Sequence, residues 1–232
     1  MAPQPVALIL GSGPRVGASV AAAFLSKGYS VATASRSGTG VKTSEGYLSL
    51  AADFADPSSI SALFGSVKNT FGAAPSVVIY NAAGLTPPPN SASVLSIPAE
   101  RFVNDLNVNT VSPYVAAQKA VEEWATLPGD IKKTFIYTGN PLNVQVAPMP
   151  LFLNLGVGKR ASTYWIAVAD ETYAAKGYRF HYADERAEGG KGKGNNLDGP
   201  AHGEFYSQLA SHEGNIPWHA TFVAGEGYGK FD

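Results

Sequence analysis

Val6-Ala-Leu-Ile-Leu10 is followed at once by Gly11-Ser-Gly-Pro-Arg-Val-Gly17. The first five residues predict a strand buried on both faces because they are continuously apolar. The glycines allow a tight turn, after which Val16, Val20 and Phe24 recur at helical spacing. A buried strand, a glycine turn and an amphipathic helix together predict the first half of a βαβ unit.

The same alternation of short apolar runs and amphipathic stretches continues to the end of the chain. Asp56-Pro57 predicts a helix start, with the acid as N-cap. The other predicted strands are 29–34, 47–52, 76–80, 134–138, 178–183 and 219–223, and the later helices are 98–125, 156–175 and 201–212. This order predicts one α/β domain over residues 1–232: a Rossmann-like, doubly wound sheet of about seven parallel strands with helices on both faces.

Composition excludes several classes of function. The 232 residues contain seventeen Lys and Arg against eighteen Asp and Glu, so a broad surface for nucleic acid is not expected. The chain has no cysteine for disulfides or thiolate metal sites, and its four histidines are scattered, so no metal site is predicted. The early apolar run is too short to cross a bilayer and lacks a basic segment before it. A cytoplasmic protein that does not bind membranes is expected.

In doubly wound sheets, ligands bind beyond the carboxyl ends of the strands. The segments predicted at this edge are Gly11–Gly17, Ser35–Ser37, Asp53, Asn81–Gly84, Thr138–Asn140 and Asp184–Arg186. A glycine-rich turn before the first helix permits close approach of a pyrophosphate, which the helix N-terminus stabilises. A purely structural turn is the alternative.

The residues after the second predicted strand bear on the choice of cofactor. An acid there favours NAD(H) by binding ribose hydroxyls, whereas an arginine accommodates a 2′-phosphate. The chain has Ser35-Arg36-Ser37 and no acid. The pattern therefore favours NADP(H) over NAD(H), unless Arg36 is only a solvated surface residue.

Over essentially its whole length, the chain resembles the short-chain dehydrogenase/reductase family. Asp53 stands where the family's aspartate meets the adenine, and Asn81-Ala-Ala-Gly84 resembles the family's Asn-Asn-Ala-Gly. Asn109 matches the asparagine of helix four, and Lys159 fits the lysine of Tyr-x-x-x-Lys. The cofactor residues predicted from the pattern and the resemblance are Gly11, Ser12, Gly13, Arg15, Val16, Gly17, Ser35, Arg36, Ser37, Asp53, Phe54, Asn81, Ala82, Ala83, Gly84 and Lys159.

Asn109 also has a physical signal of its own. Pro113, four residues later, has no N–H, so the carbonyl of Asn109 loses its helical partner. A freed carbonyl at a kink can hold a water, which is the use that the family makes of this position. The alternative is that Pro113 only shapes the helix.

The chain departs from the family where a proton donor is needed. Four residues before Lys159, the position of the family's tyrosine is Leu155, which cannot donate a proton. Straight alignment puts Gly139 at the serine position, with Thr138 one place earlier.

Two further departures concern the turn and the sixth strand. Arg15 replaces the middle glycine of the dinucleotide turn, and Glu185-Arg186 replaces a Pro-Gly pair. Asp184 could act as an acid with a raised pKa, or form a structural ion pair with Arg186. The candidate catalytic residues are Lys159, Asn109, Thr138 and Asp184.

These observations predict an NADP(H)-binding oxidoreductase, a reductase of a small organic substrate such as an imine, an iminium, or a polarised C=C or C=O. The alternatives are a cofactor-binding pseudoenzyme or sensor without redox turnover, and a non-redox isomerase or cyclase. A homodimer or homotetramer is also expected. Tyr164, Trp165 and Val168 give the helix at 156–175 more apolar surface than one sheet face can cover.

Overall fold

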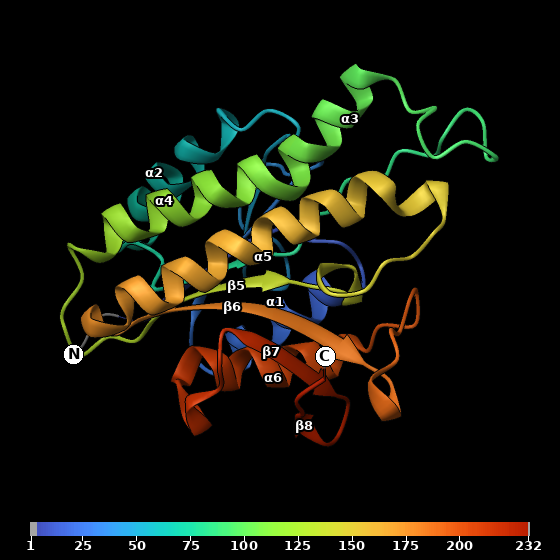
Figure 1. Cartoon of the computed structure of the whole chain (residues 1–232). Coiled ribbons are helices and arrows are strands. Elements are labelled where there is room, and N and C mark those ends of the chain that lie inside the picture. The colour runs from blue at the N-terminus through green and yellow to red at the C-terminus, as the bar shows by residue number, and fades with distance from the viewer. Residues whose placement is uncertain (1–3, 232) are drawn as a thin grey trace.

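The computed structural model describes residues 4–231, in which one eight-stranded sheet lies between two layers of helices (Figure 1). The strands are β1 (Val6–Leu10), β2 (Ser30–Ser35), β3 (Leu48–Ala51), β4 (Val77–Tyr80), β5 (Lys133–Thr138), β6 (Tyr178–Arg186), β7 (His219–Val223) and β8 (Gly227–Tyr228). Their order across the sheet is β3-β2-β1-β4-β5-β6-β7-β8. The chain reverses its direction of winding between β1 and β4, which is where such a sheet binds ligands.

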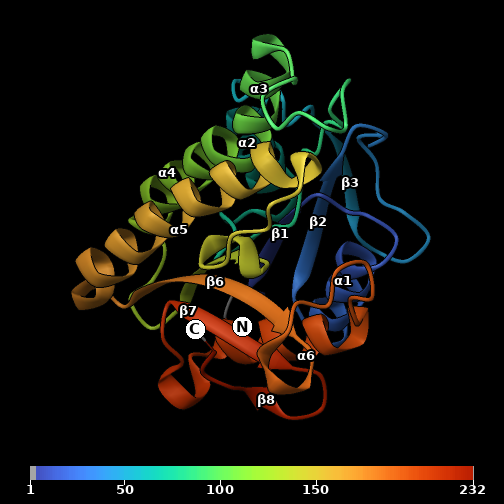
Figure 2. The same cartoon turned by 45° about the vertical axis from the view of Figure 1, so that its right-hand side comes forward.

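The helices cover both faces of the sheet. On one face, α1 (Val16–Ser26) packs against α6 (Gly199–Ser211) over a core of apolar side chains from β1, β4 and β7. On the other face, α2 (Ser59–Phe71), α4 (Ser112–Trp124) and α5 (Leu153–Tyr173) cover a second core that contains Trp124 and Phe135. Figure 2 shows the two layers from the side, with α3 (Ala99–Leu106) extending beyond the sheet.

The predicted doubly wound sheet is confirmed, with two corrections to its strands. Seven strands are parallel, and β8 adds an antiparallel eighth that the sequence pattern did not reveal because it has only two residues. The sixth strand was predicted to end at Ala183 but continues to Arg186. It can do so because Asp184 and Arg186 neutralise each other while Glu185 accepts a hydrogen bond from the backbone N–H of Asp198 (2.8 Å).

Several helix bounds also differ from the prediction. The helix predicted at 98–125 is α3 and α4 joined by a π-helical turn at Asn107–Val111. Helix α2 begins only at Ser59, with Ser58 at its N-cap position, and Asp56 instead accepts the N–H of Ser58 in the turn before the helix. Helix α5 begins at Leu153, and Asp198 caps the earlier start of α6 through the N–H of Ala201 (2.9 Å).

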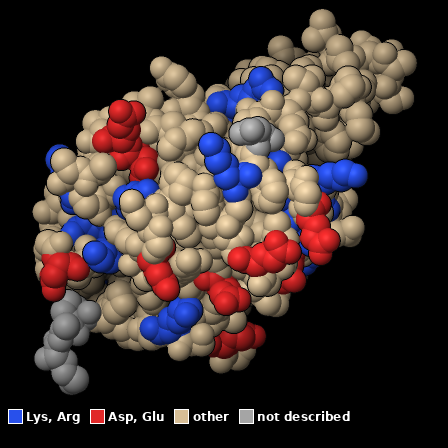
Figure 3. All heavy atoms as spheres, turned by 60° about the horizontal axis from the view of Figure 1, so that its bottom comes forward, with Lys and Arg blue, Asp and Glu red and all other residues tan. Residues whose placement is uncertain are grey.

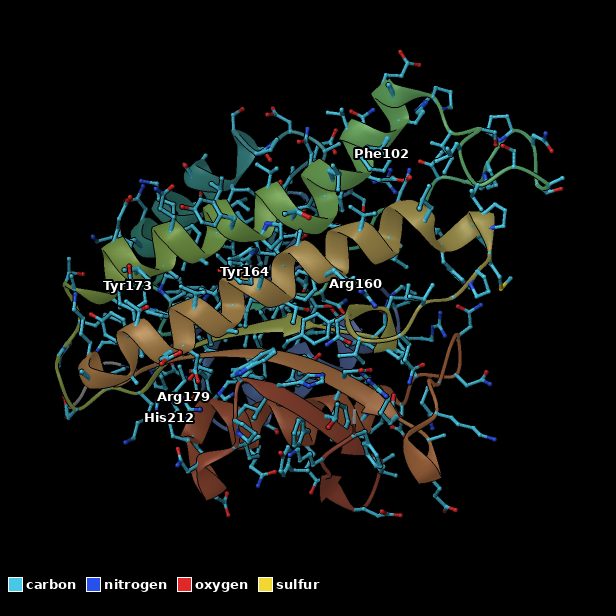
Figure 4. The ribbon with its side chains drawn as sticks, in the orientation of Figure 1. Phe102, Arg160, Tyr164, Tyr173, Arg179 and His212 are labelled. Atoms are coloured by element: carbon cyan, nitrogen blue, oxygen red, sulfur yellow. The ribbon has the colours of Figure 1, made fainter. Side chains whose placement is uncertain are left out.

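The outer face of α4 and α5 leaves apolar surface exposed. A groove of about 450 Å³ between these helices is lined by Tyr114, Trp165 and Val168, among others. Tyr164 points away from the sheet and is 77% exposed (Figure 4). The subunit contact expected on this helix stays a prediction.

Charged side chains of both signs are interspersed on the face shown in Figure 3, which agrees with the balanced composition. Among residues 4–231, no helix is long and apolar enough to cross a membrane.

Candidate functional site

A cavity of about 850 Å³ opens at the carboxyl edge of the sheet, beside the switch between β1 and β4. Of the predicted cofactor residues, Gly11, Ser12, Gly13, Ser35, Arg36, Ser37, Asp53, Phe54, Asn81, Ala82, Ala83 and Gly84 line it. The fold thus brings together four segments that are far apart in the sequence.

Glycine is required at two positions of the turn after β1. Gly11 has φ +103°, and a Cβ there would lie 2.5 Å from the backbone nitrogen of Ala82. A Cβ at Gly17 would lie 2.7 Å from the carbonyl oxygen of Gly11, so glycine lets α1 pack directly on the turn. Gly13, by contrast, has no atom within 4 Å of a built Cβ. The turn is therefore closely packed on the protein side and open on the cavity side.

The opposite wall carries the polar groups at the ends of β2 and β3. The hydroxyl oxygens of Ser35 and Ser37 lie 3.2 Å apart, on either side of Arg36 in the sequence. Asp53 accepts the N–H of Ala55 through one carboxylate oxygen (3.0 Å). One guanidinium, two hydroxyls and one carboxylate therefore meet at this end of the cavity.

Three predicted residues of the turn do not line the cavity. Val16 and Gly17 are buried, where they serve the packing of α1. Arg15 is exposed, and its guanidinium donates a hydrogen bond to the backbone carbonyl of Asn195.

Sequence reasoning missed the wall contributed by α3 and the segment after Gly84. Thr86 and Asp105 line the cavity, and the Asp105 carboxylate accepts both the N–H and the hydroxyl of Thr86, each at 3.0 Å. Asp105 also accepts the side-chain amide of Asn154 (2.9 Å). The sequence carries no signal for this wall, because its contacts join residues that belong to no recognised motif.

Lys159 does not line the cavity either, and its contact with the cofactor stays a prediction. Its ammonium nitrogen donates to the carbonyl of Thr138 (2.7 Å) and lies 4.3 Å from the centre of the Tyr137 ring. Burial lowers the pKa of Lys159 to about 7, an effect that the negative charge of Asp184 partly offsets.

Asp184 and Thr138 lie in the same buried region as Lys159. Asp184 forms an ion pair with Arg186 (2.6 Å), and burial raises the pKa of Asp184 to about 6 although Arg186 opposes the shift. The second carboxylate oxygen of Asp184 has no hydrogen-bond partner. The hydroxyl of Thr138 accepts a hydrogen bond from Tyr206 (2.9 Å). Of the two roles considered for Asp184, the structure shows the ion pair with Arg186.

The carbonyl of Asn109 is occupied, contrary to the prediction of a water-binding group. It accepts hydrogen bonds from the hydroxyls of Tyr137 (2.8 Å) and Ser162 (2.7 Å). The side chain of Asn109 holds the backbone of Gly84, accepting from its N–H (2.9 Å) and donating to its carbonyl (2.8 Å). Both polar ends of this residue therefore fix protein segments together.

Two tyrosines in a row of three donate hydrogen bonds to carbonyls of the π-helical turn, Tyr80 to Val108 and Tyr137 to Asn109. Tyr80, Tyr137 and Tyr182 occupy one row across β4, β5 and β6, and their neighbouring rings stack at centre distances of 5.7 and 5.6 Å. The N–H of Ser112 bonds to the carbonyl of Asn107, as in a π-helix, which leaves the carbonyl of Val108 to accept from Tyr80 (2.6 Å). We call this row the tyrosine ladder.

Comparison with known proteins identifies the family. The chain is 38% identical over 241 residues to the short chain dehydrogenase/reductase dmxR12 of Cryptosporiopsis sp. (strain 8999), an alignment that covers 98% of this chain and 95% of the relative. The chain belongs to the short-chain dehydrogenase/reductase family. No model of a protein family matches it.

Solved short-chain dehydrogenase/reductases and their relatives share the fold. A 3-oxoacyl-[acyl-carrier protein] reductase from Brucella melitensis, solved with NAD, has a TM-score of 0.76 and 17% identity, covering 95% of each chain. A metagenomic short-chain oxidoreductase, solved with NADP, has a TM-score of 0.74 and 14% identity, covering 95% of this chain and 96% of that one.

The cavity fits the nicotinamide dinucleotide that short-chain dehydrogenase/reductases use. Its floor is a glycine turn at a helix N-terminus, open at Gly13, which suits a diphosphate. Arg36 and two serine hydroxyls supply donors for a phosphate or ribose at one end.

Gly139, the position that the sequence analysis aligns with the family's serine, leaves no room for a side chain. A Cβ at Gly139 would lie 2.6 Å from Cδ1 and 2.8 Å from Cζ of the Tyr182 ring. The hydroxyl of Tyr182 then bonds to both the carbonyl (2.8 Å) and the N–H (3.0 Å) of Asn140. The ring of Tyr182 thus fills the space that a side chain at position 139 would need.

Proposed function

We propose that the protein is an NADP(H)-dependent reductase of a small organic substrate with a polarised double bond, working without the family's tyrosine. The observation that carries the proposal is the cavity in which Arg36, two serine hydroxyls and the glycine turn come together. Because the solved relatives include complexes with NAD and with NADP, the choice of cofactor must rest on this chain's own residues.

The charge at the end of β2 supports NADP(H). Arg36 lines the cavity with Ser35 and Ser37, and no carboxylate follows β2 at this point. A guanidinium binds a phosphate through charge-assisted hydrogen bonds, and flanking hydroxyls add neutral donors. Asp53, farther along the same wall, is available to the adenine.

The residues near the reacting end favour particular substrates. The cofactor supplies a hydride when it is bound. Leu155, one helical turn before Lys159 on α5, offers no proton. A neutral ketone gains negative charge on oxygen as hydride arrives, so it needs a donor at that place. An iminium or a strongly polarised alkene depends much less on a proton donor. The positioning of the hydride donor and acceptor accounts for more of the rate of its reduction.

A direct experiment is single-turnover oxidation of bound NADPH by a panel of iminium, enone and ketone substrates. We expect oxidation with iminium or enone acceptors and almost none with simple ketones. Fast ketone reduction by the native protein would contradict the proposal. Asp184 would then be the first candidate for the proton donor. Failure to bind NADPH would contradict it at an earlier step.

A second candidate is a cofactor-binding protein without redox turnover. The observation that favours it is the position of Lys159, which is buried against Thr138 and does not line the cavity. Tight NADPH binding, with no hydride transfer to any acceptor in the panel, would support this function instead of a reductase.

Replacing Arg36 by aspartate is expected to weaken NADPH binding by about 1.5–3 kcal/mol, the scale of a charge-assisted hydrogen bond. NADH binding should change much less, because it lacks the 2′-phosphate. Both dissociation constants can be measured by fluorescence titration. Lys42→Asp makes the same change of charge outside the cavity and serves as the control. Equal constants for the two cofactors in the native protein would refute the preference.

Leu155→Tyr is expected to increase the rate of ketone reduction at least about tenfold, because a positioned general acid typically contributes about 10²–10⁴. Lys159 is already four residues downstream on the same helical face. The matched control is Leu155→Phe, which adds the ring without the hydroxyl. Equal ketone reduction by the two variants would show that the phenol is not used as an acid.

A further inference from the structure

Helix α3 and the turn after it present one face to the cavity. Arg101, Asn104, Asp105 and Val108 line the cavity, and their spacing of three and four residues places them on one side of a helix. Asp105 is only 5% exposed, whereas Arg101 and Asn104 lie open to solvent. The start of α5 lies beside α3 (Figures 1 and 2). A buried carboxylate therefore stands in this wall of the cavity, on the side of α5.

The hydrogen-bond partners of Asp105 are all neutral. Its carboxylate accepts the N–H and the hydroxyl of Thr86 and the side-chain amide of Asn154. Among residues 4–231, no lysine, arginine or histidine forms an ion pair with it. Buried carboxylates are usually paired with a cation, because removing a charge from water is costly. Three neutral hydrogen bonds reduce that cost but leave the negative charge uncompensated.

Asn154 adds a second acceptor beside this carboxylate. Its amide must turn the nitrogen toward Asp105, since a carboxylate accepts hydrogen bonds and does not donate them. The amide oxygen is then left without a hydrogen-bond partner, although Asn154 is fully buried. Because nearly all buried polar atoms have a partner, an unpartnered oxygen next to an unpaired carboxylate indicates a missing donor.

The two acceptors lie where the family's proton donor would stand. Asn154 directly precedes Leu155 on α5. Asp105 is four residues before Asn109, whose side chain holds the backbone of Gly84. A Cβ at Gly84 would lie 3.0 Å from a carboxylate oxygen of Asp105. The negative charge is therefore placed against Gly84, next to the part of α5 from which a tyrosine would donate.

We propose that the substrate is a cation, an iminium, recognised by the carboxylate of Asp105 and the amide oxygen of Asn154. The proposal rests on the reductase function proposed above and narrows its substrate. Of the imine, iminium, C=C and C=O groups considered there, only the iminium carries a positive charge. A carboxylate supplies the opposite charge, and the amide oxygen supplies the negative end of a dipole.

The charge of Asp105 favours reduction of an iminium over that of a ketone. Hydride adds to the iminium carbon while the electron pair of the C=N bond moves to nitrogen, so that the iminium and NADPH give a neutral amine and NADP⁺. This step requires no proton, and the amine then takes one from water. A ketone would instead develop a negative oxygen close to the carboxylate, which like-charge repulsion disfavours.

The test compares a permanently charged N-methyl cyclic iminium with a neutral cyclic enone of the same ring size, both at saturating NADPH. In Asp105→Asn, we expect the ratio of kcat/KM for the iminium to kcat/KM for the enone to fall about tenfold to hundredfold, the effect of losing one contact with a charged group. Asp105→Glu keeps the negative charge and should retain much of the native ratio.

The matched control is Glu100→Gln, which removes the same charge from an exposed side chain of α3 that does not line the cavity. Its ratio should equal that of the native chain. A native ratio in Asp105→Asn would overturn the inference and leave the reductase function intact. Failure of the native chain to reduce either compound would instead overturn the proposed function.

A measurement on the native chain covers the case in which Asp105→Asn does not fold. With NADP⁺ bound, the chain should bind the cyclic amine product, which is protonated in water, at least about tenfold more tightly than a neutral cyclic alcohol of the same ring size. Calorimetry gives both dissociation constants without turnover. Equal affinities would overturn the inference even if both compounds in the kinetic test are reduced, and a preference for the cation would support it.

Discussion

Gly139→Ser is expected to lower the free energy of unfolding by about 3 kcal/mol, the upper part of the range for overpacking a buried site. A side chain at position 139 would overlap the ring of Tyr182, whose hydroxyl is held by both backbone groups of Asn140. The ring also stacks on Tyr137, so it has little freedom to move away. Urea unfolding of the two proteins measures the difference.

The matched control for this substitution is Gly156→Ser on α5. A Cβ there meets only Leu142, at 3.9 Å, and serine has a better helix propensity than glycine. We expect this variant to be as stable as the native protein or slightly more so. Equal stability of Gly139→Ser and the native chain would show that the ring of Tyr182 can move aside at little cost. The family's serine could then be restored by one substitution.

Lys159→Met is expected to become more stable relative to the native protein as the pH falls from about 10 to 7. Burial lowers the pKa of Lys159 from 10.5 in the unfolded chain to about 7 in the folded one. The unfolded chain therefore binds a proton in this window that the folded chain does not, and the native protein loses stability as the pH falls. Methionine has nearly the same length and does not titrate.

Between pH 10 and pH 7 the effect is about 3–4 kcal/mol, at about 1.4 kcal/mol for each pH unit of the shift, because the unfolded lysine is already partly protonated at pH 10. Urea unfolding of both proteins at pH 10 and pH 7 gives the two differences to be compared. Lys27→Met, which removes a positive charge from an exposed side chain, controls for the general effect of charge. A difference between native and Lys159→Met proteins that stays constant with pH would mean that the amine is not desolvated in the folded state.

The first βα unit could be predicted from sequence because its information is local. An unbroken apolar run specifies β1, and a turn that needs glycine at Gly11 and Gly17 specifies the start of α1. Most of the cavity at the carboxyl edge could be predicted in the same way, since parallel strands bring their carboxyl ends to one edge. The wall at Thr86 and Asp105 could not be predicted, because its hydrogen bonds depend on how α3 is placed by the whole fold.

Around Lys159 and Asn109, the sequence predicted less than it did for the first βα unit. The spacing of Lys159 predicted its helix but not the direction of its long side chain, which burial and the Thr138 carbonyl decide. Pro113 predicted a freed carbonyl at Asn109 but not its occupants, which come from β5 and α5. The extension of β6 was not predicted because three consecutive charged residues, Asp184 to Arg186, are typical of a loop. The ion pair and the hydrogen bond that satisfy them within a strand are known only from the structure.

The tyrosine ladder gives this protein an optical property. Phenol ionisation shifts ultraviolet absorbance, so an alkaline titration counts the tyrosines that can lose a proton in the folded state. Burial raises the pKa of Tyr80, Tyr137 and Tyr182, and also that of Tyr206 in the core on the other face of the sheet. Of the eleven tyrosines, these four should therefore not ionise until the chain unfolds. A sudden rise in absorbance from their ionisation would mark the loss of the sheet edge on which the site is built.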